Sequence, residues 1–236
     1  MSHTGKLYLI PVPISSAPVF ANIPPYNAEV VSRLRFFIAE DAKTARRSLK
    51  SFNYPSIAEA EISLLNEHSM PGEEHKLLEP LLAGHDVGLM SDAGCPGVAD
   101  PGAAVVRLAH SRAVQVIPLT GPSSILMSVM ASGFTGQNFA FVGYLPVEKG
   151  PRQARLRELE SLASRSRQAQ FFIETPYRNE QLLETIIATL SGSTFLFIGR
   201  DITGDAEFLR SRTVREWKTA RPPQLHKMPV VFGIFV

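Results

Sequence analysis

The chain has 236 residues, of which 44% are hydrophobic and 19% charged, which is typical of a globular protein with one large α/β domain or two small ones. The net charge of +2 excludes a strongly basic protein, and the single cysteine excludes an internal disulfide. The amino terminus lacks the apolar segment of a secretory signal, and no apolar run approaches the ~18 residues of a membrane span. We therefore expect a cytoplasmic protein without membrane association.

The first half of the chain alternates short apolar runs with helical segments. Strands are expected over residues 7–13, 35–39, 62–65, 87–90 and 114–118. Helices are expected over residues 27–33, 71–83 and 103–110. Strands that alternate with helices in this way predict a mostly parallel sheet.

The loop after the strand at 87–90 is the most distinctive stretch of the chain. Residues 91–102 read Ser-Asp-Ala-Gly-Cys-Pro-Gly-Val-Ala-Asp-Pro-Gly, and the glycines allow a ligand to approach the backbone closely. Asp100 is expected to cap the following helix, and Pro101 to occupy its first position. In open α/β sheets, ligands bind in loops at the carboxyl ends of the strands. A tight crossover loop without a ligand explains the same residues equally well.

Two other segments carry groups that a ligand would use. Residues 40–47 place two carboxylates and several cations after the strand at 35–39, although a solvated helix face explains them better. Residues 120–124 (Thr-Gly-Pro-Ser-Ser) begin a helix that extends to about Ser132, and the free N–H groups at its start could meet a ligand. An ordinary capped helix is the favoured interpretation there.

The second half of the chain is expected to repeat the alternation. Strands are expected over residues 139–143, 170–173, 194–198 and 228–236, helices over 151–163 and 181–190, and mixed structure over 207–217. We place the domain boundary near Pro118, which gives domains of residues 1–118 and 119–236. The chain has no Gly-x-Gly-x-x-Gly, Walker A or nucleophile-elbow motif, and its six histidines lack metal-ligand spacing, so no metal site is expected.

Five sequence blocks resemble one known family. Residues 91–102 resemble the Ser-Asp-Ala-Gly-Thr-Pro-Gly-Ile-Ser-Asp-Pro-Gly block of the ribosomal RNA small subunit methyltransferase I family, which belongs to the tetrapyrrole methylase superfamily. The other blocks are residues 40–41, 121–123, 174–178 and 200–203, and they extend the resemblance over nearly the whole chain. The chain departs from the family pattern in residues 14–25 and at Gly204, where the family has a lysine.

The resemblance implies two α/β domains that hold S-adenosyl-L-methionine (SAM) in the cleft between them. It implies that the cofactor is bound by residues of three loops, namely Pro13, Ile14, Ser91, Asp92, Ala93, Gly94, Cys95, Gly97, Val98, Pro122, Ser123 and Ser124. The carboxylates Glu40, Asp41 and Glu174 are the candidate catalytic residues, because a ribose hydroxyl is a poor nucleophile until it loses its proton. The cations Lys43, Arg178 and Arg200 would bind the phosphates of the substrate.

The implied function is SAM-dependent methylation of a ribose 2′-hydroxyl in ribosomal RNA, with the small ribosomal subunit as the partner. The modest net charge and the altered loops leave open the methylation of a tetrapyrrole or another small molecule. A SAM-binding protein without catalysis is the third possibility. Relatives of this fold are commonly dimeric and the chain ends on an apolar strand, so a homodimer is expected.

Overall fold

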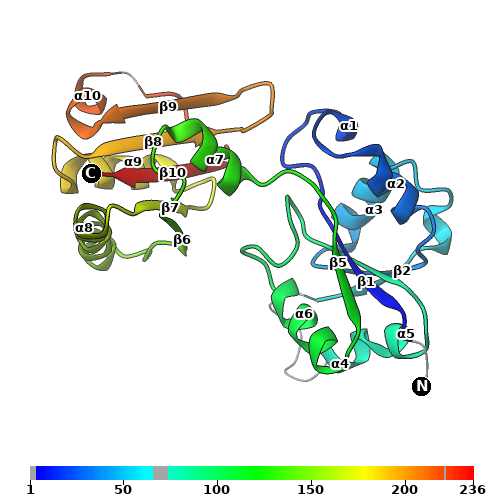
Figure 1. The fold of residues 1–236 in the computed structure, drawn as a ribbon. Helices are drawn as coiled ribbons and strands as arrows, with labels where there is room; N and C mark the ends of the chain where they lie inside the picture. The colour runs from blue at the N-terminus through cyan, green and yellow to red at the C-terminus, as the bar shows by residue number, and fades with distance from the viewer. Residues whose placement is uncertain (1–3, 66–73, 221) are drawn as a thin grey trace. The chain divides into compact units, whose positions relative to one another are not determined.

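The chain forms two compact units, residues 1–123 and 124–236, each with its own sheet and core (Figure 1). The structure is a computed structural model that describes residues 4–65, 74–220 and 222–236. The units divide between Ser123 and Ser124, whereas the boundary expected from the sequence lies near Pro118. No helix in the described residues is long and apolar enough to cross a membrane.

The first unit is built on a parallel sheet. Its strands are β1 (Lys6–Ile10), β2 (Phe36–Ala39), β3 (Glu61–Leu64), β4 (Val87–Met90) and β5 (Gln115–Pro118). They lie in the order β3-β2-β4-β1-β5 and every pairing is parallel, which confirms the parallel sheet expected from the alternation. Because neighbouring parallel strands end at the same edge, the loops after β2, β4, β1 and β5 begin next to one another.

Helices cover both faces of this sheet (Figure 1). The helices of this unit are α1 (Val19–Asn22), α2 (Pro25–Val31), α3 (Ala42–Ser51), the 3₁₀ turn η1 (Ile57–Glu59), α4 (Glu74–Leu77), α5 (Glu79–Leu82) and α6 (Gly102–Ser111). Side chains of β1 alternate between two cores: Ile10 packs in the core beneath α2 and α3, and Leu7 packs in the core beneath α5 and α6. A strand that is buried on both faces has to be apolar throughout, as in β4, all four residues of which are buried.

The helix expected over residues 71–83 is interrupted in the part that the structure describes. α4 ends at Leu77 and α5 begins at Glu79, while residues 71–73 lie outside the described residues. Pro80 lacks an N–H group, and its ring clashes with the carbonyl four residues earlier in a helix. The prediction of one continuous helix is therefore wrong between residues 74 and 83.

The second unit contains a mixed sheet. Its strands are β6 (Phe139–Tyr144), β7 (Ala169–Ile173), β8 (Phe195–Arg200), β9 (Phe208–Thr213) and β10 (Val230–Phe235), and its helices are α7 (Ser124–Ser132), α8 (Lys149–Ser166), α9 (Asn179–Thr189) and α10 (Val214–Thr219). The strand order is β6-β7-β10-β8-β9, and only β6 and β7 pair in parallel. The second half therefore does not repeat the parallel pairing of the first. For β8 and β9 the reason is the short connection between them, since a short connection permits only an antiparallel pair.

The last strand lies in the middle of this second sheet. β10 pairs with β7 on one side and with β8 on the other, and residues 230–234 are buried. The apolar end of the chain is thus accounted for by the core of its own unit, and it gives no support to a dimer interface. The homodimer stays a prediction that depends on the family resemblance.

The helix α10 anchors the only tryptophan of the chain. Thr213 and Glu216 form a capping box that fixes the start of α10. This places Trp217 in the core, where its ring is 2% exposed and its Nε1–H donates to the carbonyl of Leu196 at 2.9 Å. A buried ring with a satisfied polar group contributes strongly to the stability of a core.

We expect Trp217→Ala to lower the free energy of unfolding by about 3–5 kcal/mol, because it removes a large buried ring and leaves a cavity. Trp217→Phe, which keeps an aromatic ring but loses the hydrogen bond, is the matched control and is expected to cost less. Urea unfolding followed by circular dichroism measures both. Equal costs for the two variants would contradict the packing role that we assign to the ring.

Candidate functional site

The loop after β4 is held in shape by its own side chains. The buried Ser91 hydroxyl donates to the carbonyls of Ala93 and Gly94 at 3.1 and 3.3 Å. The Asp100 carboxylate accepts hydrogen bonds from the N–H groups of Gly97 and Gly102 at 2.8 and 2.7 Å. These bonds close residues 91–102 into a compact turn that does not depend on a ligand.

The start of α6 differs from the expectation. The helix begins at Gly102 with Pro101 as its N-cap residue, so Asp100 is not the N-cap and Pro101 is not the first helical residue. The chain turns through positive φ at Gly97 (81°) and Ala99 (60°), and this delays the helix. Asp100 still satisfies the first N–H group of the helix, from a position inside the loop.

The loops after β1, β4 and β5 are joined to one another. Val12 and Gly94 exchange two backbone hydrogen bonds, at 2.9 and 3.2 Å. The Cys95 thiol lies 3.3 Å from the carbonyl oxygen of Pro122. A Cβ atom added at Gly121 would overlap the ring of Pro11, so only glycine permits this close approach of the loops after β1 and β5. Three segments from distant parts of the sequence thus form one rim at the carboxyl edge of the sheet.

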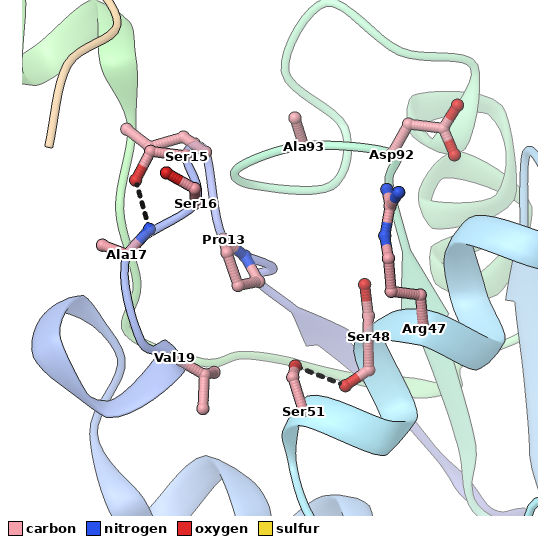
Figure 2. Close-up of a pocket in the computed structure, with 11 residues that line it drawn as sticks. Pro13, Ser15, Ser16, Ala17, Val19, Arg47, Ser48, Ser51, Asp92 and Ala93 are labelled. Atoms are coloured by element: carbon pink, nitrogen blue, oxygen red, sulfur yellow. Dashed lines mark hydrogen bonds between the residues drawn. The ribbon is translucent and has the colours of Figure 1, made fainter. Parts of the chain in front are cut away.

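A cavity of about 510 Å³ adjoins the loops after β1 and β4 (Figure 2). Small-molecule sites occupy roughly 300–1,000 Å³, so this volume suits a ligand or part of a larger one. The cavity is lined by the loop after β1 and the first residue of α1, by α3 and by the start of the loop after β4. The lining residues are Pro13, Ile14, Ser15, Ser16, Ala17, Val19, Arg47, Ser48, Ser51, Asp92 and Ala93.

Arg47 and Asp92 bring opposite charges to this cavity (Figure 2). Burial raises the pKa of Asp92, the negative charge of Asp41 adds to the rise, and the Arg47 guanidinium opposes it. A carboxylate that is costly to keep charged is stabilised by hydrogen-bond donors. The Asp92 carboxylate is therefore suited to accept hydrogen bonds from a ligand.

The two carboxylates that follow β2 have different environments. The Asp41 carboxylate caps α3 by accepting the Thr44 N–H at 2.7 Å, and this hydrogen bonding holds its pKa below the usual range. Burial raises the pKa of Glu40, and the negative charges of Asp100 and Asp92 add to the rise. Asp41 thus has a structural partner for its charge, whereas Glu40 is the carboxylate that the site makes easier to protonate.

Three of the expected catalytic and substrate-binding residues belong to the second unit. The Glu174 side chain is fully buried, and its Oε1 accepts from Thr175 N–H at 2.6 Å and from Arg178 Nη2 at 2.7 Å. Arg200 donates from Nε to the Ala206 carbonyl and from Nη1 to the Gln224 carbonyl, both at 2.9 Å. Each of these side chains has bonds that stabilise its own unit.

The expected cofactor residues fall into three groups. Four of them line the cavity: Pro13, Ile14, Asp92 and Ala93. Three lie in the contacts between loops: Gly94, Cys95 and Pro122. The remainder do not line this cavity: Ser91, Gly97, Val98, Ser123 and Ser124.

Sequence reasoning missed Arg47 and the four serines of the cavity. Arg47 lies four residues after Lys43, so both cations lie on one face of α3, and that spacing could have identified it. Ser15 and Ser16 lie in the loop after β1, where the chain departs from the family, and they were not predicted as site residues. Ser48 and Ser51 lie on α3 and carried no signal in the sequence. Only the fold brings these two segments together.

Comparisons with known proteins identify relatives. No protein-family model matches the chain. The chain is 32% identical to ribosomal RNA small subunit methyltransferase I of Mesorhizobium japonicum over 209 residues. This alignment covers 89% of this chain and 67% of that protein. It is 30% identical to the Bacillus subtilis protein of the same name, over 91% of this chain and 70% of that one. The Escherichia coli O157:H7 protein of that name is 29% identical, over 90% of this chain and 70% of that one.

A solved structure shows the same fold. The crystal structure of the methyltransferase CobJ matches with a TM-score of 0.64 over 98% of this chain and 94% of that one. Its sequence is 15% identical, so this likeness concerns the fold alone. The sequence relatives, together with the fold, confirm the family resemblance. The chain belongs to the ribosomal RNA small subunit methyltransferase I family of the tetrapyrrole methylase superfamily, a family of SAM-dependent methyltransferases.

Proposed function

We propose that this protein transfers the methyl group of SAM to a ribose 2′-hydroxyl of small-subunit ribosomal RNA. The observation that carries the proposal is the rim of three joined loops beside a cavity that contains Arg47 and Asp92. The name of the relatives supports the acceptor class, ribosomal RNA of the small subunit.

The loops after β1, β4 and β5 fit a cofactor of this kind. Gly94 and Gly97 have positive φ, and Gly121 has no room for a side chain, so the loops present backbone at these points. Backbone N–H and C=O groups then bind the ligand directly. We assign Asp92 to the polar groups of the cofactor, since its carboxylate is a hydrogen-bond acceptor. When bound, SAM supplies an electrophilic methyl group on a positively charged sulfur.

We assign the cavity to the acceptor nucleotide. Arg47 lies in its wall, and a guanidinium binds a phosphate through two parallel N–H donors. Lys43, one turn earlier on α3, adds a second cation on the same face of the helix. Pro13 and Ala93 belong both to the cavity and to the cofactor loops, so a nucleotide held in the cavity is next to the cofactor.

A carboxylate has to accept the proton that the ribose hydroxyl loses. Of the three candidates, Asp41 is engaged as a helix cap and Glu174 is bonded to Arg178. Glu40 has a raised pKa, and a general base works best when its pKa approaches the working pH. Glu40 does not line the cavity itself, but its carboxylate accepts a backbone hydrogen bond from Asp92, which does line it. We therefore assign proton acceptance to Glu40, with Asp41 and Glu174 as residues that position their own elements.

The two arginines of the second unit keep donors for a phosphate. A guanidinium has five N–H donors. Arg200 uses Nε and Nη1 for backbone carbonyls, and Arg178 uses Nη2 for Glu174. These bonds fix the direction of each side chain. Nε of Arg178 is buried, so we propose that Nη1 of Arg178 and Nη2 of Arg200 bind the RNA backbone.

Incubation with tritiated SAM and small ribosomal subunits tests the acceptor. Subunits from cells that lack the gene should accept label in their RNA, and wild-type subunits should not, because their site is already methylated. Label in a tetrapyrrole or another small molecule, with none in the RNA, would favour the small-molecule alternative. SAM binding without transfer to either acceptor would indicate a protein that has lost catalysis.

Gly121→Ala tests the joined loops as the cofactor site. The added Cβ would overlap Pro11 and push the loops after β1 and β5 apart. We expect calorimetry to show at least about tenfold weaker binding of S-adenosylhomocysteine, since a shift of an ångström suffices to misplace bound groups. Gly150→Ala is the control, because nothing lies within 4 Å of its added Cβ, and it should bind as the wild type does. Equal affinities for all three proteins would contradict the assignment.

Glu40→Gln tests proton acceptance. We expect methyl transfer at pH 7 to fall about 10²–10⁴-fold while the affinity for S-adenosylhomocysteine is retained. In the wild type, the acid limb of the pH–rate profile should lie above the ordinary pKa of a glutamate, because burial raises the pKa of Glu40. An unchanged rate in the variant, or an acid limb in the ordinary glutamate range, would contradict the role.

The melting temperature gives an independent measurement of the same shift. The pKa of Glu40 is raised in the folded protein. Protonated Glu40 therefore contributes to stability below the ordinary pKa of a glutamate, and this contribution is lost as pH rises through the pKa of the folded state. Glu40→Gln should therefore raise the melting temperature at pH 7, with no gain near pH 4. Asp41→Asn has the opposite sign, because the lowered pKa of Asp41 stabilises the fold above its ordinary pKa. It should lower the melting temperature at pH 7.

A further inference from the structure

The positive charge of the chain is concentrated in one segment of the second unit. Residues 208–227 contain six lysines and arginines and one glutamate, a net charge of +5. The other 216 residues contain 18 lysines and arginines and 21 acidic residues. The overall net charge of +2 therefore hides a basic segment on an otherwise acidic chain, and such a separation of charge is typical of an anion-binding surface.

The strand β9 begins this segment and presents its arginines on one face. Side chains alternate along a strand, so Phe208, Arg210 and Arg212 share a face. The other face bears Ser211, whose hydroxyl donates to the Ser132 carbonyl at the end of α7. β9 is also the last strand of its sheet, next to β8 alone (Figure 1). The arginine face thus lies along an open edge of the sheet.

Aromatic rings hold these arginines in place. The guanidinium of Arg210 lies 5.8 Å from the ring centre of Phe208, and that of Arg200 lies 6.0 Å from the same ring. The guanidinium of Arg212 lies 5.3 Å from the ring of Trp217. Stacking on a ring orders a guanidinium without using its N–H donors, so less entropy is lost when those donors bind a phosphate. We call Arg200, Phe208, Arg210 and Arg212 the β9 strip.

In the described part of the chain, two arginines of the strip, Arg210 and Arg212, are not paired directly with a carboxylate. Within residues 4–65, 74–220 and 222–236, no carboxylate forms an ion pair within 4.0 Å of Arg210 or Arg212. Glu216 is the carboxylate on which the charge of Arg212 acts, and it is engaged in the capping box with Thr213. Arginines that repel one another without a carboxylate between them are stabilised by an external anion.

We infer that the β9 strip binds the phosphate backbone of the RNA substrate, and this inference rests on the proposed function. Ordered guanidinium groups bind phosphate oxygens through paired N–H donors. The name of the relatives favours RNA over an acidic protein as the source of those anions. The residues of the strip belong to the second unit and are not among those that line the cavity, so we assign them to RNA affinity and not to methyl transfer.

The full chain with Arg210→Glu and Arg212→Glu tests this inference. The probe is a labelled transcript of small-subunit ribosomal RNA, and the readout is its affinity over a range of salt concentrations. We expect binding at least about tenfold weaker than in the wild type, with the salt slope reduced by about 1.4 for two lost contacts to single-stranded phosphates. Affinity for S-adenosylhomocysteine should not change. Arg210→Gln with Arg212→Gln removes the charges without reversing them, and serves if the first pair fails to fold.

The matched control reverses Arg157 and Arg165 to glutamate, two exposed arginines of α8, with the same change in net charge. It should bind RNA nearly as the wild type does. Three results would each overturn the inference. One is wild-type RNA affinity in the double variant of Arg210 and Arg212, and another is an equal loss of affinity in that variant and in the control. The third is displacement of the RNA by polyglutamate. If the wild type methylates RNA but the double variant of Arg210 and Arg212 binds RNA as tightly as the wild type, the role of the β9 strip is wrong and the proposed function stands. If the wild type methylates only a small molecule, the proposed function fails first.

Discussion

The candidate site depends on the backbone pairing of Val12 with Gly94. These two residues lie beyond the ends of β1 and β4, which are neighbours in the sheet, and their two hydrogen bonds continue the contact of the strands into their loops. Glycine is needed at position 94 because φ is +75° and because a Cβ would press on Ile14. The same requirement recurs at Gly121 against Pro11, which joins the loop after β5 to the same rim. The cavity beside Arg47 and Asp92 exists because these loops are held at fixed positions.

Much of the first unit could be predicted from local patterns. The strand at 87–90 was predicted with the bounds that the structure has, because a strand buried on both faces is apolar throughout. Asp100 was predicted as an N-cap, and it does bind the first N–H group of α6, but the turn through Gly97 and Ala99 moves the start of the helix. A change in φ at a non-glycine residue such as Ala99 leaves no trace in the sequence.

Contacts between distant segments could not be predicted in the same way. β10 inserts between β7 and β8, and nothing in its apolar sequence distinguishes a central antiparallel strand from a parallel one or from an interface. The role of Arg47 depends on α3 facing the loop after β1, which is a property of the packed unit. The role of a residue such as Arg47 can therefore be recognised only once the packing of the unit is known.

The turn around Gly204, where the chain departs from the family, is held by hydrogen bonds. The turn between β8 and β9 has positive φ at Asp201 (47°) and Thr203 (68°), and the Asp201 carboxylate accepts the Ala206 N–H at 2.9 Å. A Cβ atom at position 204 would overlap that carboxylate, so a side chain there requires the Asp201 carboxylate to turn away from the Ala206 N–H.

Hydrogen exchange of the full chain, measured by mass spectrometry with and without S-adenosylhomocysteine, tests the central claim most directly. The claim is that the rim made by the loops after β1, β4 and β5 binds the cofactor. The account predicts slower exchange at residues 12–16, 91–98 and 120–123 when the ligand is present, since their backbone N–H groups would bind it or become buried by it. Protection confined to other segments, with these three unchanged, would contradict it.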